Sequence, residues 1–199
     1  MALSRSLAVA AVAAALLAAG TQTAMAAPSA ATVSRFDDGS FEYPTAPANS
    51  FSTLTAGQSI GPWKVASGTV DLIGAGFWQA AEGDQSVDLN GGQAGAVAQT
   101  FTTIPGRTYT VTYALAANPA GGPALKTGKV LVDGQNFQDF SFDSTGKTFT
   151  ALGYVQRQVT FVATASATTL GFASTVSGAY GPVVDDVRVT AASPCSCSK

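Results

Sequence analysis

Apolar and polar residues alternate with a period of two along most of the chain after residue 35. In the segment RTYTVTYALAA, Tyr109, Val111, Tyr113 and Leu115 lie on one face and threonines lie on the other. Successive residues of a strand point to opposite faces, so this alternation predicts a half-buried strand. Similar segments read KVLVDG, QDFSFD, QVTFVATA, TTLGFAS, GTVDLIG, SVDLNG and AVAQTFTT.

Turn signals separate these segments, among them NPAGGP, TIPG, DSTG and the Asp-Gly pair that ends KVLVDG. No helical period of useful length occurs after the first 26 residues. Many short strands with frequent turns predict an all-β fold, and about eight to ten strands in one domain fit a jelly-roll β-sandwich. We expect this domain to occupy residues 35–191.

The first 26 residues have the pattern of a secretory signal peptide. Arg5 precedes an apolar run from Leu7 to Ala19, and Ala24-Met25-Ala26 matches a cleavage site. The run is too short to span a bilayer, which makes an N-terminal membrane anchor the weaker alternative. We therefore expect a protein that is secreted, extracellular or associated with the cell wall, with residues 27–34 as a short linker. No second apolar run approaches the length of a membrane span.

The composition excludes several classes of function. The chain has 10 Lys and Arg against 12 Asp and Glu, without a basic cluster, which argues against binding to nucleic acid or to an anionic membrane surface. It has no His, which removes the commonest general base and the usual zinc ligand. The two cysteines, Cys195 and Cys197, lie in the C-terminal tail 192–199 and are too close for an unstrained internal disulfide. The tail is either disordered or forms an intermolecular or cell-wall crosslink.

Two adjacent carboxylates interrupt an apolar segment, YGPVVDDVRVT, near the C-terminus. Asp185 has the same parity as Val183, Val187 and Val189 and should point inward, whereas Asp186 should face solvent, unless a bulge shifts the phase. An inward carboxylate requires a cation or several N–H donors.

A possible partner lies at the other end of the domain, in FDDGSFEYP, where Asp38, Ser40 and Glu42 share a parity. The first and last strands of an antiparallel sandwich often pair, which would bring Glu42 close to Asp185. An all-oxygen set of ligands suits Ca²⁺. The alternatives are a buried ion pair between Asp185 and Arg35, or a carboxylate that accepts hydrogen bonds from backbone N–H groups.

Five segments follow one another in a recognisable order: DDGSFEYP, IGPWKVASGTVDLI, FWQAAEGDQSVDLNGGQAGAVAQTFTTIPGRTYTVTYALAANP, LGYVQRQVTFVA and GPVVDDVRV. From Phe36 to Thr190 the chain resembles the choice-of-anchor C family of bacterial secreted proteins and is similar to the plant cell-wall domain-of-unknown-function family 642. The resemblance implies a galactose-binding-domain-like jelly roll, related to carbohydrate-binding modules. In those modules, the Glu and the first Asp of the matching motifs bind a structural calcium, and here they correspond to Glu42 and Asp185. Asp38 stands where the modules usually have Asn.

Binding to a polysaccharide requires exposed flat side chains and polar groups for the sugar hydroxyls. Trp63 begins an apolar strand and is expected in the core, whereas Trp78 lies among Gly and polar residues and is the better candidate for an exposed ring. Tyr180, beside Gly181-Pro182, is a further candidate.

Polar residues also share one face of the segment SVDLNG. Ser86, Asp88 and Asn90 point away from the two apolar residues between them, and together with Asn118 they could line a polar groove. The alternative is an ordinary solvated face of the sheet.

The sequence therefore predicts a non-catalytic module that binds a cell-wall polysaccharide or surface glycan and holds a structural calcium. The alternative is an extracellular structural or adhesion protein that binds another protein and has no sugar site. A glycosidase would require two facing carboxylates, such as Glu82 with Asp84 or Asp88. No nucleophile elbow, phosphate loop or metalloprotease motif occurs, so we expect no enzymatic activity.

Overall fold

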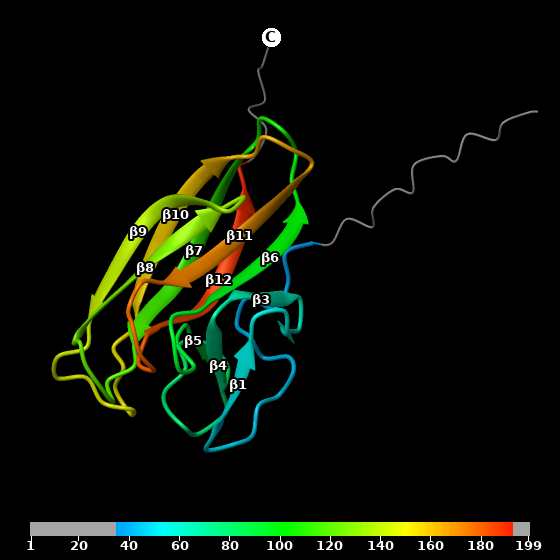
Figure 1. Cartoon of the computed structure of the whole chain (residues 1–199). Helices are drawn as coiled ribbons and strands as arrows, with labels where there is room; N and C mark the ends of the chain where they lie inside the picture. The colour runs from blue at the N-terminus through cyan, green and yellow to red at the C-terminus, as the bar shows by residue number, and fades with distance from the viewer. Residues whose placement is uncertain (1–34, 193–199) are drawn as a thin grey trace, which may run out of the picture. The chain divides into compact units, whose positions relative to one another are not determined.

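The computed structural model describes residues 35–192, which form two antiparallel sheets of six strands each (Figure 1). The first sheet contains, in spatial order, β1 (Phe51–Thr55), β4 (Thr69–Ile73), β5 (Ser86–Asp88), β12 (Pro182–Ala191), β7 (Thr108–Ala117) and β10 (Val155–Val162). The second sheet contains β2 (Ser59–Ile60), β3 (Trp63–Ser67), β6 (Ala96–Thr102), β11 (Ala167–Ser174), β8 (Leu125–Val132) and β9 (Gln135–Asp143). The predicted all-β jelly-roll sandwich is confirmed.

The two sheets bury one apolar interior between them. The alternating residues of β7 predicted from the sequence face this interior, where Tyr113 packs against the second sheet with its ring centroid 4.9 Å from that of Phe172 and 6.2 Å from that of Phe140. Trp63 is fully buried, as predicted, and its Nε1 donates to the Asp38 carbonyl oxygen at 2.9 Å. Within residues 35–192, no helix has the length and apolar character needed to cross a bilayer.

The predicted Asp-Gly turn joins β8 to β9. Asp133 and Gly134 have φ values of 50° and 77°, the two positive values that a two-residue type I′ hairpin requires. The predicted signal peptide (1–26), the linker (27–34) and Cys195 and Cys197 lie outside the described residues, so these expectations stay predictions.

The segment predicted as the first strand, residues 35–42, forms a turn instead. Asp38 and Phe41 both have positive φ, 46° and 59°, which interrupts an extended backbone. The segment still lies beside the last strand, because the Gly39 carbonyl oxygen accepts a hydrogen bond from the Val187 N–H at 2.9 Å. The predicted proximity of the two ends of the domain is thus present, but it rests on a local contact and not on a strand ladder.

A β-bulge divides β12 at the two adjacent carboxylates. Asp185 lies opposite Ala114 and Arg188 lies opposite Thr112, so β12 has one more residue than β7 between these positions. Asp186 has a φ of 46°. Because Thr112 and Ala114 point away from the sandwich interior and opposite residues share a face, Asp185 lies on the outer face of the first sheet. The prediction that Asp185 shares a face with the two valines that follow it is therefore wrong.

The outer face of the first sheet is covered by loops over part of its area. Asp185 and Val183 are both fully buried although they lie on this face. The covering segments connect β4 to β5, β7 to β8, β9 to β10 and β11 to β12. The candidate site lies where these loops meet the sheet.

Candidate functional site

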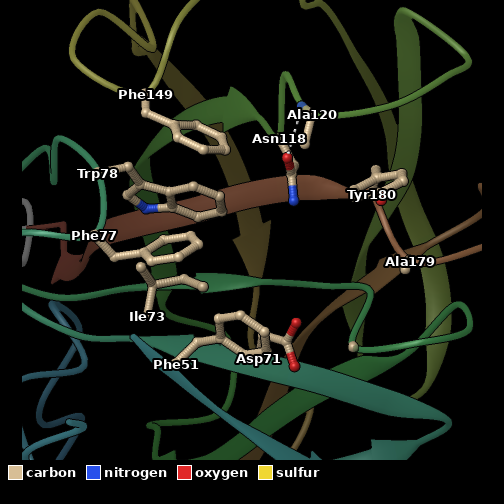
Figure 2. Close-up of a pocket in the computed structure, with 11 residues that line it drawn as sticks. Phe51, Asp71, Ile73, Phe77, Trp78, Asn118, Ala120, Phe149, Ala179 and Tyr180 are labelled. Atoms are coloured by element: carbon tan, nitrogen blue, oxygen red, sulfur yellow. Dashed lines mark hydrogen bonds between the residues drawn. The ribbon is translucent and has the colours of Figure 1, made fainter. Parts of the chain in front are cut away.

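A pocket of about 230 Å³ opens on the outer face of the first sheet (Figure 2). Figure 2 shows Phe149, Trp78 and Phe77 one above the other along one side, with Asn118 and Tyr180 toward the other side. The pocket therefore has an aromatic wall, formed by Phe51, Phe77, Trp78 and Phe149, and polar groups facing it.

The aromatic wall is built from three separate segments of the chain. The ring centroid of Phe77 lies 5.5 Å from that of Phe51, 5.5 Å from that of Trp78 and 5.6 Å from that of Phe149, which are favourable distances for aromatic pairs. The Gln79 N–H donates to the Phe149 carbonyl oxygen at 2.9 Å and ties the two loops together. Phe51 and Phe149 remain 43% and 39% exposed, so they present ring surface to a ligand.

Trp78 lies at the back of this wall. Its side chain is only 6% exposed, and its Nε1 donates to Ser86 Oγ at 2.8 Å. The expectation that Trp78 is an exposed ring is wrong, because the Gly-rich loop that carries it folds back over the sheet. The accessible rings, Phe51 and Phe149, were missed by the sequence analysis. Their signal was weak: Phe149 is an isolated aromatic residue in a polar turn, KTFTAL.

The polar side of the pocket contains Asp71, which the sequence analysis also missed. Asp71 is mostly buried, and its Oδ1 accepts a hydrogen bond from Thr53 Oγ1 at 2.6 Å. Burial raises the pKa of Asp71 above its ordinary value. A carboxylate within the apolar segment TVDLI was a detectable signal, of the same kind that singled out Asp185.

Asp88 lies behind the pocket and organises its polar side. It is fully buried; its Oδ2 accepts a hydrogen bond from Asn118 Nδ2 at 2.8 Å, and its Oδ1 accepts from the N–H groups of Asn90 (2.9 Å) and Gly181 (3.1 Å). Burial raises the pKa of Asp88 to about 7, and the negative charge of Asp71 contributes to the increase. Asp88 therefore positions pocket residues and does not itself line the pocket.

Asn90 has a similar supporting role. It is fully buried, and its Nδ2 donates to the carbonyl oxygens of Val176 (2.8 Å) and Gly178 (2.6 Å) in the loop before β12. The expectation that Asp88 and Asn90 line a polar groove is wrong, and so is the alternative of a solvated face. Loops from distant parts of the sequence cover this face of the sheet.

Asn118 and Tyr180 do line the pocket, as does Trp78. Asn118 is 9% exposed, and its Oδ1 accepts a hydrogen bond from the Ala120 N–H at 2.9 Å. Tyr180 is 41% exposed, as expected. The structure thus brings together three of the five residues predicted to bind carbohydrate, and it places Asp88 and Asn90 behind them.

Asp185 holds the loop that carries the aromatic wall. Its Oδ2 accepts hydrogen bonds from the N–H groups of Ala81 (2.7 Å) and Glu82 (3.1 Å), and its Oδ1 accepts from the Asp186 N–H at 2.6 Å. Burial raises the pKa of Asp185 to about 7, and these hydrogen bonds oppose the increase. The sequence analysis gave two alternatives to a calcium site at Asp185, an ion pair with Arg35 and hydrogen bonds from backbone N–H groups. The structure contains the hydrogen bonds from backbone N–H groups.

Glu42 binds the same loop from its other side. Its Oε1 accepts hydrogen bonds from the N–H groups of Asp84 (2.9 Å) and Gln85 (2.8 Å). Gly83 lies between the two sets of contacts with a φ of 61°, and a Cβ atom there would collide with Glu42 Oε1. We call Glu42 and Asp185 the carboxylate clasp, because together they fix the loop through its backbone.

The residues predicted to bind calcium lie around this clasp. Asp38 Oδ1 accepts a hydrogen bond from the Glu42 N–H at 2.8 Å, and Ser40 belongs to the same turn. All four residues offer oxygen, the donor that Ca²⁺ prefers, so their chemistry fits this ion. Within residues 35–192, no group of three or more His, Cys, Asp or Glu side chains is arranged to hold a metal. The calcium site stays a prediction.

The fold and the site define an antiparallel β-sandwich with a loop-built aromatic pocket on one sheet. The chain belongs to the family described as protein of unknown function DUF642, whose model matches residues 34–190. This match confirms the predicted similarity to family 642, while the resemblance to choice-of-anchor C proteins stays a prediction. The chain is 30% identical over 149 residues to halomucin of Haloquadratum walsbyi, covering 73% of this chain and 2% of that protein's length.

The solved structures to which the chain is similar include carbohydrate-binding modules. A family 35 carbohydrate-binding module from Clostridium thermocellum is 16% identical, with a TM-score of 0.48 over 71% of this chain and 99% of the module. TmCBM61, solved in complex with beta-1,4-galactotriose, is 16% identical, with a TM-score of 0.46 over 65% of this chain and 88% of that one.

Proposed function

We propose that the protein is a secreted, non-catalytic carbohydrate-binding module and that its sugar ligand, part of a polysaccharide or surface glycan, occupies the pocket of the first sheet. The observation that carries this proposal is the aromatic wall facing Asp71 and Asn118. Sugars have apolar ring faces that pack on aromatic side chains and hydroxyl groups that require hydrogen-bonding partners. The pocket offers both kinds of surface at once. Secretion is supported by the signal-peptide pattern of residues 1–26.

The pocket residues have complementary roles in this proposal. Phe51 and Phe149 offer exposed ring surface, while Phe77 packs against both rings and Trp78 packs against Phe149. A carboxylate has about four lone-pair sites, and Thr53 uses one of those on Asp71, so sugar hydroxyls can donate to the others.

Replacement of Phe149 by Ala tests this role directly. We expect retention of the mature chain on an insoluble polysaccharide to weaken about tenfold, because one stacking ring is lost. Phe137→Ala is the matched control, since Phe137 is a 46% exposed ring on β9 of the second sheet and lies outside the pocket. Equal weakening by both variants, or none by Phe149→Ala, would refute binding in this pocket.

Binding without catalysis is favoured by the positions of the acids that a glycosidase mechanism would use. Glu82 and Asp84 are exposed in the loop held by the carboxylate clasp, and neither lines the pocket. Asp88 is fully buried behind Asn118. These three carboxylates therefore do not face a shared ligand space.

We also propose a structural calcium held by Glu42 and Asp185, with oxygens from Asp38 and Ser40. The ion would supply positive charge between the turn 38–42 and β12. A chelator should then lower the melting temperature, and added Ca²⁺ should restore it, as measured by circular dichroism. If the chelator leaves the melting temperature unchanged, the backbone N–H groups stabilise the carboxylate clasp without a cation and the calcium proposal is wrong.

An adhesion protein that binds another protein is the second candidate. Threonine pairs occupy exposed sheet surface, with Oγ1–Oγ1 distances of 2.6 Å for Thr127 and Thr175 and 3.5 Å for Thr110 and Thr160. Such polar surface, together with the buried Trp78, favours this candidate. Binding of no glycan in a broad array, combined with capture of one defined surface protein, would support it over the first proposal.

A further inference from the structure

The charged groups around the pocket are acidic. Asp71 lines the pocket, and Asp88 lies directly opposite it on the neighbouring strand. The pocket lining contains neither Lys nor Arg. The Lys126 Nζ lies 5.9 Å from the centre of the Tyr180 ring, but Lys126 is fully buried and donates to the Gly121 carbonyl oxygen at 2.6 Å. A ligand in the pocket would therefore contact the Asp71 carboxylate and no accessible cation.

This arrangement has opposite consequences for neutral and for anionic sugars. A uronate or a sulfate ester near Asp71 would lose hydration and experience repulsion from a like charge, with no cation to compensate. A neutral sugar presents hydroxyl donors, and Asp71 is an acceptor with unused lone pairs.

The size of the pocket limits how much of a glycan it can hold. Its volume of about 230 Å³ is below the ~300–1,000 Å³ typical of sites for drug-sized ligands. Phe51 and Asp71 are diagonal neighbours on β1 and β4, and Figure 2 shows the Asp71 carboxylate beside Phe51, so one sugar ring can contact both. The pocket thus suits a single glycosyl unit.

We propose that the pocket binds one uncharged glycosyl unit, through hydroxyl groups that donate to Asp71 and a ring face that packs on Phe51 and Phe149, and that it discriminates against uronate and sulfated units. This inference rests on the proposed function and specifies its class of ligand.

Polysaccharides that differ only in charge provide the test. Suitable pairs are polygalacturonate with its carboxyl-reduced form, carboxymethyl-cellulose with hydroxyethyl-cellulose, and a sulfated galactan with its desulfated form. In affinity electrophoresis at pH 7.5, the mature chain will bind some of these pairs. For each pair that it binds, we expect the affinity for the neutral polymer to be at least about tenfold higher than the affinity for the acidic polymer. The difference in affinity between the neutral and the acidic polymer should decrease as salt is added, because salt screens the repulsion between Asp71 and the acidic polymer.

Two variants test whether the preference for the neutral polymer arises in the pocket. Asp71→Asn should weaken binding of the neutral polymer and decrease the difference in affinity between the two members of a pair. Ala120→Lys adds a cation at an exposed position of the pocket lining and should strengthen binding of the acidic member about fivefold or more. Ala165→Lys is the matched control, since it adds the same charge at an exposed loop position outside the pocket. Thermal melts establish that each variant is folded.

The possible outcomes separate this inference from the proposed function. Equal or tighter binding of the acidic members would overturn the preference for neutral sugars and leave carbohydrate binding intact. The same gain from Ala165→Lys as from Ala120→Lys would show that the charge acts outside the pocket, which also overturns the inference. Failure of the folded protein to bind any polymer of either charge would remove the proposed function, and this inference with it.

Discussion

Asp185→Ala is expected to lower the free energy of unfolding by about 3 kcal/mol or more. The variant leaves the backbone N–H groups of Ala81, Glu82 and Asp186 without their acceptor, and a buried unsatisfied donor costs about 1–3 kcal/mol. For a domain of this size, the loss corresponds to a decrease of roughly 6–12 °C in melting temperature. Because Ala81 and Glu82 belong to the loop that carries Trp78, a change in tryptophan fluorescence should accompany the destabilisation.

The neighbouring carboxylate provides the control. Asp186 pairs with the exposed Arg188 guanidinium (2.7 Å), an interaction that is typically weak at a surface. Asn is the appropriate replacement, because Asp186 has a φ of 46°, which Asn tolerates better than Ala. We expect Asp186→Asn to change stability by less than about 0.5 kcal/mol. Equal effects of Asp185→Ala and Asp186→Asn in chemical denaturation would contradict the described roles of the two acids.

The protein is expected to become less stable as the pH rises from about 4 to about 7. Burial raises the pKa of Asp88 to about 7 in the fold, against about 3.9 in an unfolded chain. In this interval the folded state binds more protons than the unfolded state, so the free energy of unfolding decreases with pH. For Asp88 alone, the decrease is on the order of 4 kcal/mol, and most of it should be present by pH 7.

Other titrating groups face Asp88 and contribute to the measured curve. The charge of Asp71 raises the pKa of Asp88, and Asp88 in turn acts on Lys126, whose pKa is lowered by burial, and on Tyr154, whose pKa is raised by burial. Asp185, whose pKa burial also raises to about 7, contributes a decrease over the same interval. Asp88→Asn removes one of these two titrating groups while keeping its shape, so it should reduce the decrease between pH 4 and pH 7 by about half. Thermal melts at half-unit pH steps measure the effect. A stability that is constant or rises over this interval would contradict the description of Asp88 as a buried, desolvated acid.

The strands were predictable because their alternation is local. Residues such as Tyr109 and Tyr113 identify a face without any knowledge of distant contacts. The bulge in β12 was not predictable in the same way. It depends on the positive φ of Asp186 and on the Val187 N–H that bonds to Gly39, near the other end of the domain. A long-range contact of this kind does not change the alternation of apolar and polar residues in β12, so the sequence pattern does not reveal it.

The candidate site was predicted only in part, because residue type is a local property whereas loop packing depends on distant contacts. Trp78, Asn118 and Tyr180 could be selected by residue type and by neighbouring Gly or polar residues, and all three line one pocket. Phe149 was missed because it reaches the pocket through the loop contact between Gln79 and Phe149, and Phe51 because it reaches the pocket through the pairing of β1 with β4. Residue type therefore identified candidate ligand contacts, but the geometry that selects among them comes from long-range loop packing.

Phe77, Trp78 and Phe149 of the aromatic wall lie on loops, while Phe51 lies on β1 of the sheet beneath them. The segment that carries Phe149 meets the loop of Phe77 and Trp78 through ring contacts and one backbone hydrogen bond. Neither of these two segments supplies a strand of the sandwich. The part of the connection between β9 and β10 that precedes the fully buried Leu152 can therefore be exchanged for one of different length and composition without rebuilding the core. Libraries of this single loop offer a route to altered sugar preference on a constant scaffold.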